Sequence, residues 1–407
     1  MCKVSATYPQ LQQQWYNTTV KPNLFPTKIA LVYDWVNTPY GGAERVLVAL
    51  HKIFPQAPLY TAVYDPKVAT WAKDFTIKTS FLQNILFSQQ RHRELLPLLP
   101  LAFESLDLTA FDLVISITSA QAKAIKVHPN ALHICYLLTP TRYLWSHTHK
   151  YQQGRLQPIK ALIFSWLRQW DYQVAQKPQV IIPISQLVKQ RTQKYYRRST
   201  HPVIYPPFQF NYQTKILQTV DRKAEYYLVV SRLVPYKKVD LCIRTCVNLG
   251  KNLIIVGDGP ESKKIQSLIQ KLDPQQKLIT WYSQLTDTEL QHVYAAAKAL
   301  LLPAEEDFGI TALEAQAFGK PVIVYQHSGA AEVVKNGIAG IHFSDQTLES
   351  LSGAILESQQ HHFDSAVIKS HALLYNERTF MSQFETAVRA AWEKHQIDIQ
   401  KGPHVKC

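Results

Sequence analysis

The sequence contains no apolar run of about 18 residues, the length that a membrane-spanning helix requires. Its five cysteines are an odd number scattered over 407 residues, which argues against a disulfide framework and for a reducing compartment. The first ten residues, MCKVSATYPQ, lack the order of charged, apolar and small residues that marks a signal peptide. We therefore expect a cytoplasmic protein.

The short signatures of nucleic-acid and metal binding are also missing. The sequence has no zinc-finger spacing, no aromatic RNP-type strand and no low-complexity basic arm, so nucleic acid is not an expected partner. No Asp-x-Asp motif follows a predicted strand and acidic clusters are few, so we expect neither a bound metal nor another cofactor. With 46% hydrophobic and 18% charged residues, the composition is that of a globular chain with a large core.

Acidic residues are scarce in one half of the chain only. Residues 1–210 hold 23 Lys and Arg against 9 Asp and Glu, a net charge of +14, whereas residues 211–407 hold 21 of each. A solvated basic surface would explain this asymmetry, but an anionic partner used by the first half explains it better. Because nucleic acid is disfavoured, the sequence favours anionic lipid or a phosphate-bearing acceptor.

Strand and helix patterns alternate on both sides of a linker that contains Pro206 and Pro207. This alternation predicts an α/β protein with two doubly wound, Rossmann-like parallel-sheet domains and a ligand-binding cleft between them. In chain order we predict four parts: an arm over residues 1–26, a first domain over 27–208, a second domain over 209–375, and a terminal segment over 376–407 whose helix crosses back to the first domain.

Two glutamates lie within the segment EEDFGITALE. The segment LLLPAEEDFGI (300–310) predicts a strand that runs into a loop. This pattern places Glu306 in the loop and Glu314 inside the helix that follows, with the amides of residues 307–310 free at the helix start. Free amides and the helix dipole bind anions, typically phosphate, and carboxylates accept hydrogen bonds from sugar hydroxyls. Two glutamates at this spacing also occur often by chance, so the pair alone is weak evidence.

A basic segment, SRLVPYKKVD, follows another predicted strand. Arg232 leaves the strand end and Lys237 comes five residues later, so both side chains can face the predicted cleft. Two cations there would bind a diphosphate and stabilise it as a leaving group. A surface basic turn is the alternative, and Lys238 is the member expected to be solvated.

A glycine pair, Gly41–Gly42, follows the first predicted strand. The missing side chains let the backbone approach a phosphate or a sugar closely. The spacing is neither that of a dinucleotide-binding GxGxxG motif nor that of a P-loop. A simple tight turn is the alternative.

Taken in order, these segments make the chain similar to retaining glycosyltransferases of family 4, which have the GT-B fold. The resemblance covers nearly all of residues 28–395, and its pattern is closest to mannosyltransferase-like enzymes of bacterial surface polysaccharide assembly. The segments that carry it are Tyr33-Asp34 through GGAER, ISITSAQAKA (115–124), CYLLTPTRYLW (135–145), VIYPP (203–207), SRLVPYKKVD (231–240), VGDGPE (256–261), PAEEDFGITALEAQAFGKPVI (303–323) and SGAAEVV (328–334).

The resemblance implies roles for the residues singled out above. Glu306 would contact the hydroxyls of the donor sugar, and Glu314 those of the ribose. Arg232 and Lys237 would bind the donor diphosphate in place of a metal, and the Gly41–Gly42 loop would lie over it from the first domain.

The resemblance also places further residues in the donor pocket. The amides of Phe308, Gly309 and Ile310 would line it, and Gly257 and Asp258, in a Gly-Asp-Gly turn, would shape the pocket of the nucleotide base. The implied reaction moves a sugar from a nucleotide-diphosphate donor, GDP-mannose first and a UDP-sugar second, to a lipid- or glycan-linked acceptor.

One position departs from the family pattern. Where relatives carry a histidine that lines the donor-sugar site, this chain has Leu138, which can neither donate a hydrogen bond nor transfer a proton. Four nearby histidines, His128, His133, His147 and His149, are candidates to replace it, although each alone is more often a surface or structural histidine. The departure keeps a second hypothesis open, namely a nucleotide-sugar-binding protein of the same fold with weak or no transferase activity.

The segment QPIKALIFSWLRQWDYQVAQK, residues 157–177, has apolar and aromatic residues at helical spacing between basic ones, and the basic run KQRTQKYYRR (189–198) follows it. Such a helix suits a membrane interface, where it would dock the first domain on the inner face of the plasma membrane. The alternative is that its apolar stripe packs into the core, as most amphipathic helices do.

Overall fold

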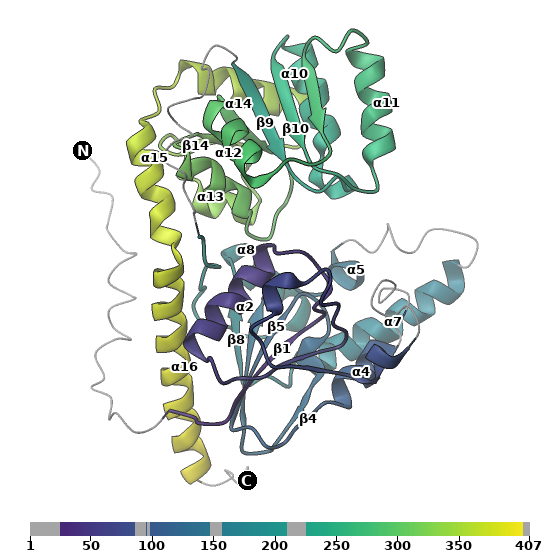
Figure 1. Ribbon diagram of the computed structural model, residues 1–407, viewed down its shortest axis with the longest axis vertical. Coiled ribbons are helices and arrows are strands. Elements are labelled where there is room, and N and C mark those ends of the chain that lie inside the picture. Colours follow the sequence, from purple (N-terminus) through teal and green to yellow (C-terminus); the bar gives the residue numbers. More distant parts are fainter. Residues whose placement is uncertain (1–24, 86–94, 96–97, 147–156, 210–224, 402–407) are drawn as a thin grey trace.

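The computed structural model describes residues 25–85, 95, 98–146, 157–209 and 225–401 (Figure 1). The predicted arm, residues 1–26, lies almost entirely outside the described residues, as does most of the stretch that follows the predicted linker prolines. We call described residues 25–209 the N-terminal lobe and residues 225–375 the C-terminal lobe.

The N-terminal lobe is built on a six-stranded sheet whose paired strands all run parallel, in the order β3-β2-β1-β5-β7-β8. Every residue of β1, β5 and β7 is buried, as expected for strands covered on both faces. The strands are β1 (Ile29–Tyr33), β2 (Leu59–Thr61), β3 (Ile77–Thr79), β5 (Leu113–Thr118), β7 (Leu132–Leu137) and β8 (Val180–Pro183), with a separate two-stranded sheet of β4 (Asp107–Leu108) and β6 (Lys126–Val127).

Helices connect these strands. They are α2 (Gly42–Ile53), α4 (Leu99–Glu104), α5 (Arg142–Trp145), α7 (Gln157–Val174) and α8 (Gln186–Tyr196), with 3-10 turns η1 (Thr70–Ala72), η2 (Phe81–Asn84) and η4 (Ala122–Ala124).

The C-terminal lobe repeats the architecture, with a second all-parallel sheet in the order β11-β10-β9-β12-β13-β14. Its strands are β9 (Tyr226–Val230), β10 (Asn252–Val256), β11 (Ile279–Tyr282), β12 (Ala299–Leu302), β13 (Val322–Tyr325) and β14 (Gly340–Phe343). Its helices are α10 (Val239–Asn248), α11 (Ser262–Leu272), α12 (Asp287–Ala296), α13 (Ile310–Ala317), α14 (Leu348–Gln360) and α15 (Ser365–Ala372), with 3-10 turns η5 (Pro235–Lys237), η6 (Gly329–Val333) and η7 (Leu373–Tyr375).

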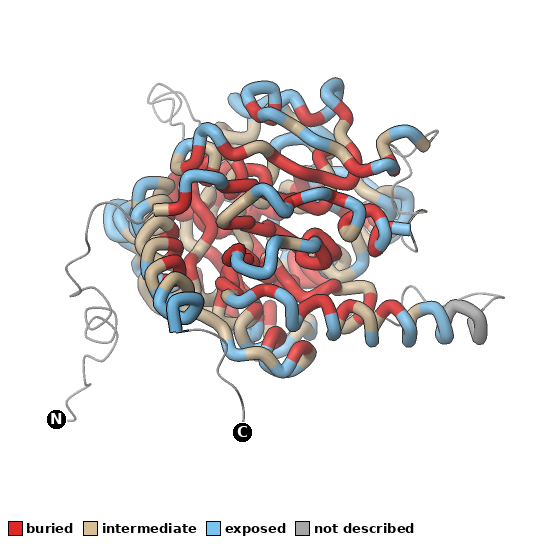
Figure 2. The backbone as a smooth tube through the Cα atoms, turned by 90° about the horizontal axis from the view of Figure 1, so that it is seen from below, coloured by how far each residue is buried: buried red, intermediate tan, exposed pale blue. Residues whose placement is uncertain are grey.

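The last helix, α16 (Glu377–Gln400), returns to the N-terminal lobe and runs along its side (Figure 1). It packs against α2 and β7, and Phe380 and Phe384 meet Tyr136 edge-on with ring centroids 5.8 and 5.6 Å apart. Lys52 of α2 also pairs with Glu377 at 2.8 Å. One continuous cluster of buried apolar residues therefore links both sheets through α16, and buried residues fill the middle of the molecule (Figure 2).

Side chains cap several helices at their starts. The hydroxyl of Ser185 accepts from the backbone of Val188 at the start of α8, and Thr286 and Glu289 form a capping box on α12. By contrast, α2 and α13 begin at Gly41 and Gly309, which have no side chain to cap with. The first N–H groups of these two helices are therefore not covered by a capping side chain.

Candidate functional site

The candidate site is centred on the loop that leaves β12 and enters α13. Glu306 is buried in this loop, and its carboxylate accepts a hydrogen bond from the ammonium group of Lys237. The backbone N–H of Glu306 donates to the hydroxyl of Ser328 at 2.9 Å, and its carbonyl accepts from Gly329 at 2.7 Å. The loop is thus pinned to the turn after β13, which fixes the carboxylate beside Lys237.

Two glycines allow these loops to approach so closely. Gly309 has φ +80°, and a Cβ there would lie 2.4 Å from the Cβ of Ala330. A Cβ on Gly329 would lie 2.1 Å from the carbonyl oxygen of Asp307. The glycines of EEDFG and SGAAEVV are therefore required for packing, and the packing in turn presents the N-terminus of α13.

Lys237 comes from η5, in the loop that leaves β9. Its side chain is 16% exposed and lies 5.5 Å from the centroid of the Tyr236 ring. Lys238 is exposed and has φ 54°, so the chain turns away directly after Lys237. Arg232, at the end of the same strand, is exposed and has no ion-pair partner among the described residues. The structure therefore brings Lys237, but not Arg232, into contact with Glu306.

The Gly-Asp-Gly turn after β10 packs against the loop that leaves β9. Leu233 donates its N–H to the carbonyl of Asp258 at 2.9 Å, and a Cβ on Gly257 would lie 2.0 Å from the carbonyl oxygen of Ser231. The Asp258 carboxylate is exposed and accepts from the hydroxyl of Ser262 and the N–H of Gly259, and these hydrogen bonds lower its pKa. In this structure Asp258 closes its own turn at the start of α11.

Glu314 lies inside α13 and is contacted from the N-terminal lobe. One carboxylate oxygen accepts from the guanidinium of Arg45 at 2.8 Å and the other from the hydroxyl of Tyr294 at 3.0 Å. Burial, followed by the charge of Glu314, raises the pKa of Tyr294 well above its usual value. Because Arg45 is in the first turns of α2, this ion pair draws the Gly41–Gly42 start of α2 toward α13.

The two glycines of that loop are not equivalent. A Cβ on Gly41 would come within 2.9 Å of the carboxylate of Glu44, a buried residue that also accepts from Tyr33 and Thr38. A Cβ on Gly42 would meet nothing within 4 Å. Gly42 therefore borders open space, which leaves room for a ligand over the start of α2.

Asp307 is the centre of a second contact between the lobes. Its buried carboxylate pairs with the guanidinium groups of Arg142 and Arg191, and Arg191 also reaches Glu305 at 2.5 Å. Arg142 lies over the ring of Tyr236 at 5.2 Å from the centroid. Burial lowers the pKa of Arg142, but the charge and hydrogen bond of Asp307, together with Tyr236 and Glu306, outweigh burial, so the net shift is upward. Both arginines thus pair with the same buried carboxylate of the C-terminal lobe.

Sequence reasoning did not single out Arg45, Arg142 or Arg191. The first two lie within GGAER and CYLLTPTRYLW, segments that carry the family resemblance, so a signal was present. Arg191 lies in KQRTQKYYRR, which we interpreted as part of a membrane-facing basic run. That interpretation is wrong for Arg191, which is 7% exposed, and for Arg198, which donates to the carbonyls of Ala175, Gln176 and Pro178.

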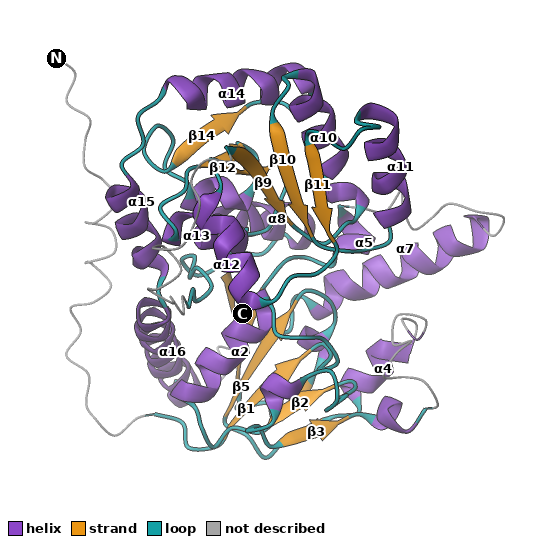
Figure 3. Ribbon diagram, turned by 45° about the horizontal axis from the view of Figure 1, so that its top comes forward, coloured by secondary structure: helices purple, strands orange, loops and turns teal. Residues whose placement is uncertain are grey.

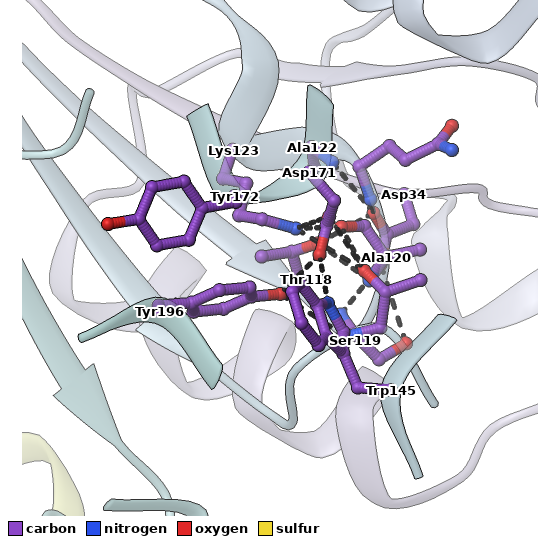
Figure 4. Close-up of polar contacts among 12 residues, drawn as sticks. Asp34, Thr118, Ser119, Ala120, Ala122, Lys123, Trp145, Asp171, Tyr172 and Tyr196 are labelled. Carbon is purple, nitrogen blue, oxygen red and sulfur yellow. Dashed lines mark hydrogen bonds and ion pairs between the residues drawn. The ribbon is translucent and has the colours of Figure 1, made fainter. Parts of the chain in front are cut away.

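A buried aspartate, Asp171, lies among the elements that carry the two arginines, and Figure 4 shows it with several of its own partners. Asp171 of α7 pairs with Lys123 at 2.7 Å and accepts from Thr141 at 2.9 Å, Trp145 at 2.7 Å and Tyr196 at 2.8 Å. These partners come from η4, from the residues around α5 and from the end of α8. Asp171 therefore ties together the elements that carry Arg142 and Arg191.

A second buried carboxylate orders the neighbouring turn. Asp34, directly after β1, accepts at 2.8 Å from the hydroxyl of Thr118 and from the N–H groups of Ser119, Gln121 and Ala122 (Figure 4). The segment ISITSAQAKA is thus explained by structure: it wraps around a carboxylate at the carboxyl ends of β1 and β5.

Part of the chain matches a known family model. Residues 215–361 match "Glycosyl transferases group 1", and this range includes Lys237, Glu306 and Glu314. Glycogen synthase from Pseudomonas aeruginosa is 29% identical over 141 residues, which is 33% of this chain and 27% of that protein. D-inositol 3-phosphate glycosyltransferase from Mycobacterium marinum is 30% identical over 132 residues, 31% of this chain and 28% of that protein. The chain spans little more than a quarter of the length of these two relatives.

Solved structures resemble nearly the whole chain. Sucrose-phosphate synthase from Thermosynechococcus elongatus superposes with a TM-score of 0.66 at 15% identity, covering 90% of this chain and 100% of that chain. Anabaena HepE in complex with UDP-glucose gives 0.65 at 18% identity, covering 89% and 100%. The lipopolysaccharide outer core galactosyltransferase WaaB gives 0.63 at 19% identity, covering 89% and 99%. The fold is GT-B.

Leu138, where the sequence resemblance leads us to expect a histidine, lies at the carboxyl end of β7. Leu138 is half-buried there, and its N–H donates to the carbonyl of Thr118 at 2.8 Å. His133 is buried within β7 against the hydroxyl of Ser116, and burial lowers its pKa to about 3. His128 precedes β7 and so lies toward its amino end. Neither of these two histidines lies at the carboxyl end of β7 beside Leu138, and the other two candidates, His147 and His149, lie outside the described residues.

Among the described residues, no group of three or more His, Cys, Asp or Glu is arranged to hold a metal ion. No described helix is both long enough and apolar enough to cross a membrane.

Proposed function

We propose that this protein is a retaining glycosyltransferase that takes its sugar from a nucleotide-diphosphate donor. The observation that carries the proposal is the pairing of Lys237 with Glu306 at the N-terminus of α13, opposite the glycine-initiated N-terminus of α2. A cation and two helix N-termini suit a diphosphate, and a carboxylate beside them suits sugar hydroxyls. The family match over residues 215–361 supports this assignment.

In the proposed complex, Lys237 and Arg232 bind the diphosphate, and the amides of Phe308, Gly309 and Ile310 face it from α13. Glu306 then accepts from the sugar hydroxyls. The bond between the anomeric carbon and the phosphate oxygen breaks, and a bond from that carbon to the acceptor oxygen forms on the same face. The departing phosphate takes the acceptor proton, so no separate base is needed. The cations stabilise the charge that develops on the leaving group without a metal.

The remaining donor contacts follow from the same placement. Glu314 accepts from the ribose hydroxyls once it exchanges its present partners, Arg45 and Tyr294, for the ligand. The Gly41–Gly42 backbone lies over the diphosphate, where Gly42 borders open space. The turn with Gly257 and Asp258 lies beside the base.

The sugar, the nucleotide and the acceptor are finer parts of the proposal. The mannosyltransferase-like sequence pattern favours GDP-mannose, whereas the UDP-glucose complex of HepE favours a UDP-sugar. The same pattern favours a lipid- or glycan-linked acceptor in polysaccharide or glycolipid synthesis. WaaB, a structural neighbour, is described as acting on lipopolysaccharide, which agrees with an acceptor of this class.

A nucleotide-sugar-binding protein of the same fold with little catalysis is the second candidate. The observation in its favour is Leu138, which leaves the end of β7 without a histidine. Both candidates bind the donor, and only the first consumes it.

Two measurements test the proposal. A thermal-shift series with GDP, UDP and ADP identifies the nucleotide, because a ligand that binds only the folded state raises the melting temperature. Donor turnover with the matching nucleotide sugar then separates the two candidates. No stabilisation by any of the three nucleotides would refute donor binding; stabilisation without turnover would favour the second candidate.

A further inference from the structure

The helix α7 carries large apolar side chains that are exposed in the described part of the chain. Leu162 is 75% exposed, Trp166 is 54% exposed and Ile163 is 40% exposed. At 100° per residue these three positions span an arc of about 100°, so they share one face of the helix. We call this face, made of Leu162, Ile163 and Trp166, the α7 patch.

The patch lies on the part of α7 that projects from the molecule. Figures 2 and 3 show this end of the helix extending away from the sheet, while its other end is embedded. The embedded end contains Leu167 and Val174, each 2% exposed, and Asp171, which anchors α7 through Lys123 and the other partners described above. The same helix is therefore core at one end and free surface at the other, and the exposed end is held rigidly in place.

A further exposed apolar residue lies on a neighbouring helix, outside the α7 patch. Leu101 of α4 is 59% exposed, and α4 and α7 both pack against η4. Figures 1 and 3 show α4 beside α7. Leu101 thus adds to the exposed apolar surface on the side of the lobe that carries α7, while Tyr40, Val68 and Phe81 are exposed on other elements.

We propose that the α7 patch inserts into the interface of an anionic lipid bilayer. A tryptophan among aliphatic residues on a projecting helix is suited to the boundary between head groups and acyl chains. The projecting shape presents the apolar side chains to a broad surface, as a bilayer offers. The inference goes beyond the proposed transferase activity and does not depend on it.

Charge complementarity selects the anionic bilayer. The first half of the sequence has an excess of cations. At the surface this positive excess is larger still, because four of the nine carboxylates of this half are buried. Those four are Asp34, Glu44, Asp65 and Asp171. Among the described cations of this lobe only Lys123 and Arg191 are buried. The one acidic residue within α7 is Asp171, so the exposed part of the helix carries no carboxylate that would repel anionic head groups.

The anionic head groups would be attracted by the net positive charge of the whole N-terminal lobe more than by cations on α7 itself. Arg168 is occupied with the carbonyl of Leu144 and the ring of Trp145, and Lys177 donates to the carbonyl of Ala124. A second copy of the chain would bring a lobe of the same positive charge against the patch, which opposes self-association through this surface. Anionic lipid is attracted by the same charge.

The test is co-sedimentation of the full chain with vesicles of phosphatidylcholine alone or mixed in equal amounts with phosphatidylglycerol, at low and high salt. We expect binding to the mixed vesicles only, weakened by salt. The variant Leu162→Ser/Trp166→Ser should bind about tenfold less tightly, because it removes most of the apolar area that enters the interface. The matched control Leu373→Ser/Leu374→Ser changes two side chains on η7 that are 59% and 63% exposed, and it should bind as the unchanged protein does.

Two outcomes would overturn the inference. The first is absence of binding to the mixed vesicles at low salt, and the second is equal binding by the α7 variant and the unchanged protein. Size-exclusion chromatography of both proteins distinguishes self-association: a dimer that only the variant loses would assign the patch to a second copy and so refute lipid docking. The thermal shift caused by nucleotide is measured without lipid. The α7 variant should show the same shift as the unchanged protein, so a failure of lipid docking can be told from a failure of donor binding.

Discussion

The assignment of Lys237 is best tested by Lys237→Met, which removes the charge and keeps much of the side-chain length. In the structure this ammonium group pairs with Glu306, and the two side chains are only 16% and 11% exposed. A unit charge about 4 Å from a phosphate oxygen is worth roughly 4 kcal/mol at an effective dielectric constant of about 20. Most of that interaction is lost with the charge.

The loss is expected mainly in the chemical step, because negative charge grows on the diphosphate as the sugar leaves. Removing one preorganised stabilising group of this kind typically lowers the rate by about 100-fold to 1000-fold, or about 2.7–4 kcal/mol. Donor turnover, measured as release of the nucleoside diphosphate, should therefore fall by about that factor in kcat/KM. Lys238→Met is the matched control, since Lys238 is adjacent, exposed and turned away.

Folding must be measured in the same proteins. Lys237→Met leaves Glu306 without its partner, and breaking a buried pair costs up to about 3–5 kcal/mol. Because neither side chain is fully buried, the cost here should be lower, and the melting temperature should drop by only several degrees. In Lys237→Met/Glu306→Gln the unpaired carboxylate is gone, so stability should recover while turnover stays low. A Lys237→Met protein as active as Lys238→Met would refute the phosphate role.

Three further predictions concern the same site. Glu314→Gln should raise the KM for donor by about tenfold with little change in kcat, because it weakens a charged hydrogen-bond acceptor; an unchanged KM would contradict its role. Asp307→Asn should lower the melting temperature more than Glu305→Gln, since Asp307 is buried and Glu305 is exposed; equal effects would count against a buried interlobe ion pair. EDTA should leave turnover unchanged, and a loss restored by manganese would show that the cations do not replace a metal.

The sheet architecture was predictable where strands form long apolar runs. The segments KIALVYDW, FDLVISIT, ALHICYLL and YYLVVSRL are mainly apolar runs that predict buried strands, and the structure confirms them as the parallel strands β1, β5, β7 and β9. The three-residue strands β2 and β3 were not predicted, because so short a segment has no periodicity to detect. These two strands form because they pair with neighbouring strands of the sheet, and such pairing is a tertiary interaction.

The candidate site was predictable in part for the same reason. Lys237 and Glu306 each follow a predicted strand, and parallel strands end at one edge of a sheet, so their proximity followed from topology. The contacts of Asp307 with Arg142 and Arg191 did not follow, because they depend on how the two lobes are packed together. No local pattern in the sequence encodes that arrangement.

The environment of α7 could not be decided from its pattern either. An amphipathic stripe looks the same whether it covers a core or faces solvent. In the structure both alternatives hold, one at each end: Leu167 and Val174 are buried, whereas Leu162 and Trp166 are exposed. The difference arises from where the helix leaves the lobe, which again is set by tertiary packing.

The ion pairs across the site connect donor binding to the arrangement of the lobes. In the structure the carboxylates of Glu306 and Glu314 pair with Lys237 and Arg45, and Arg45 comes from the opposite lobe. On the proposed function, a donor diphosphate competes with Glu306 for Lys237 and its ribose competes with Arg45 for Glu314. Binding therefore frees Glu306 to accept from the sugar and loosens one contact between the lobes. The separate pair between Asp307 and Arg191 takes no part in this exchange, so it can hold the lobes together while the donor enters.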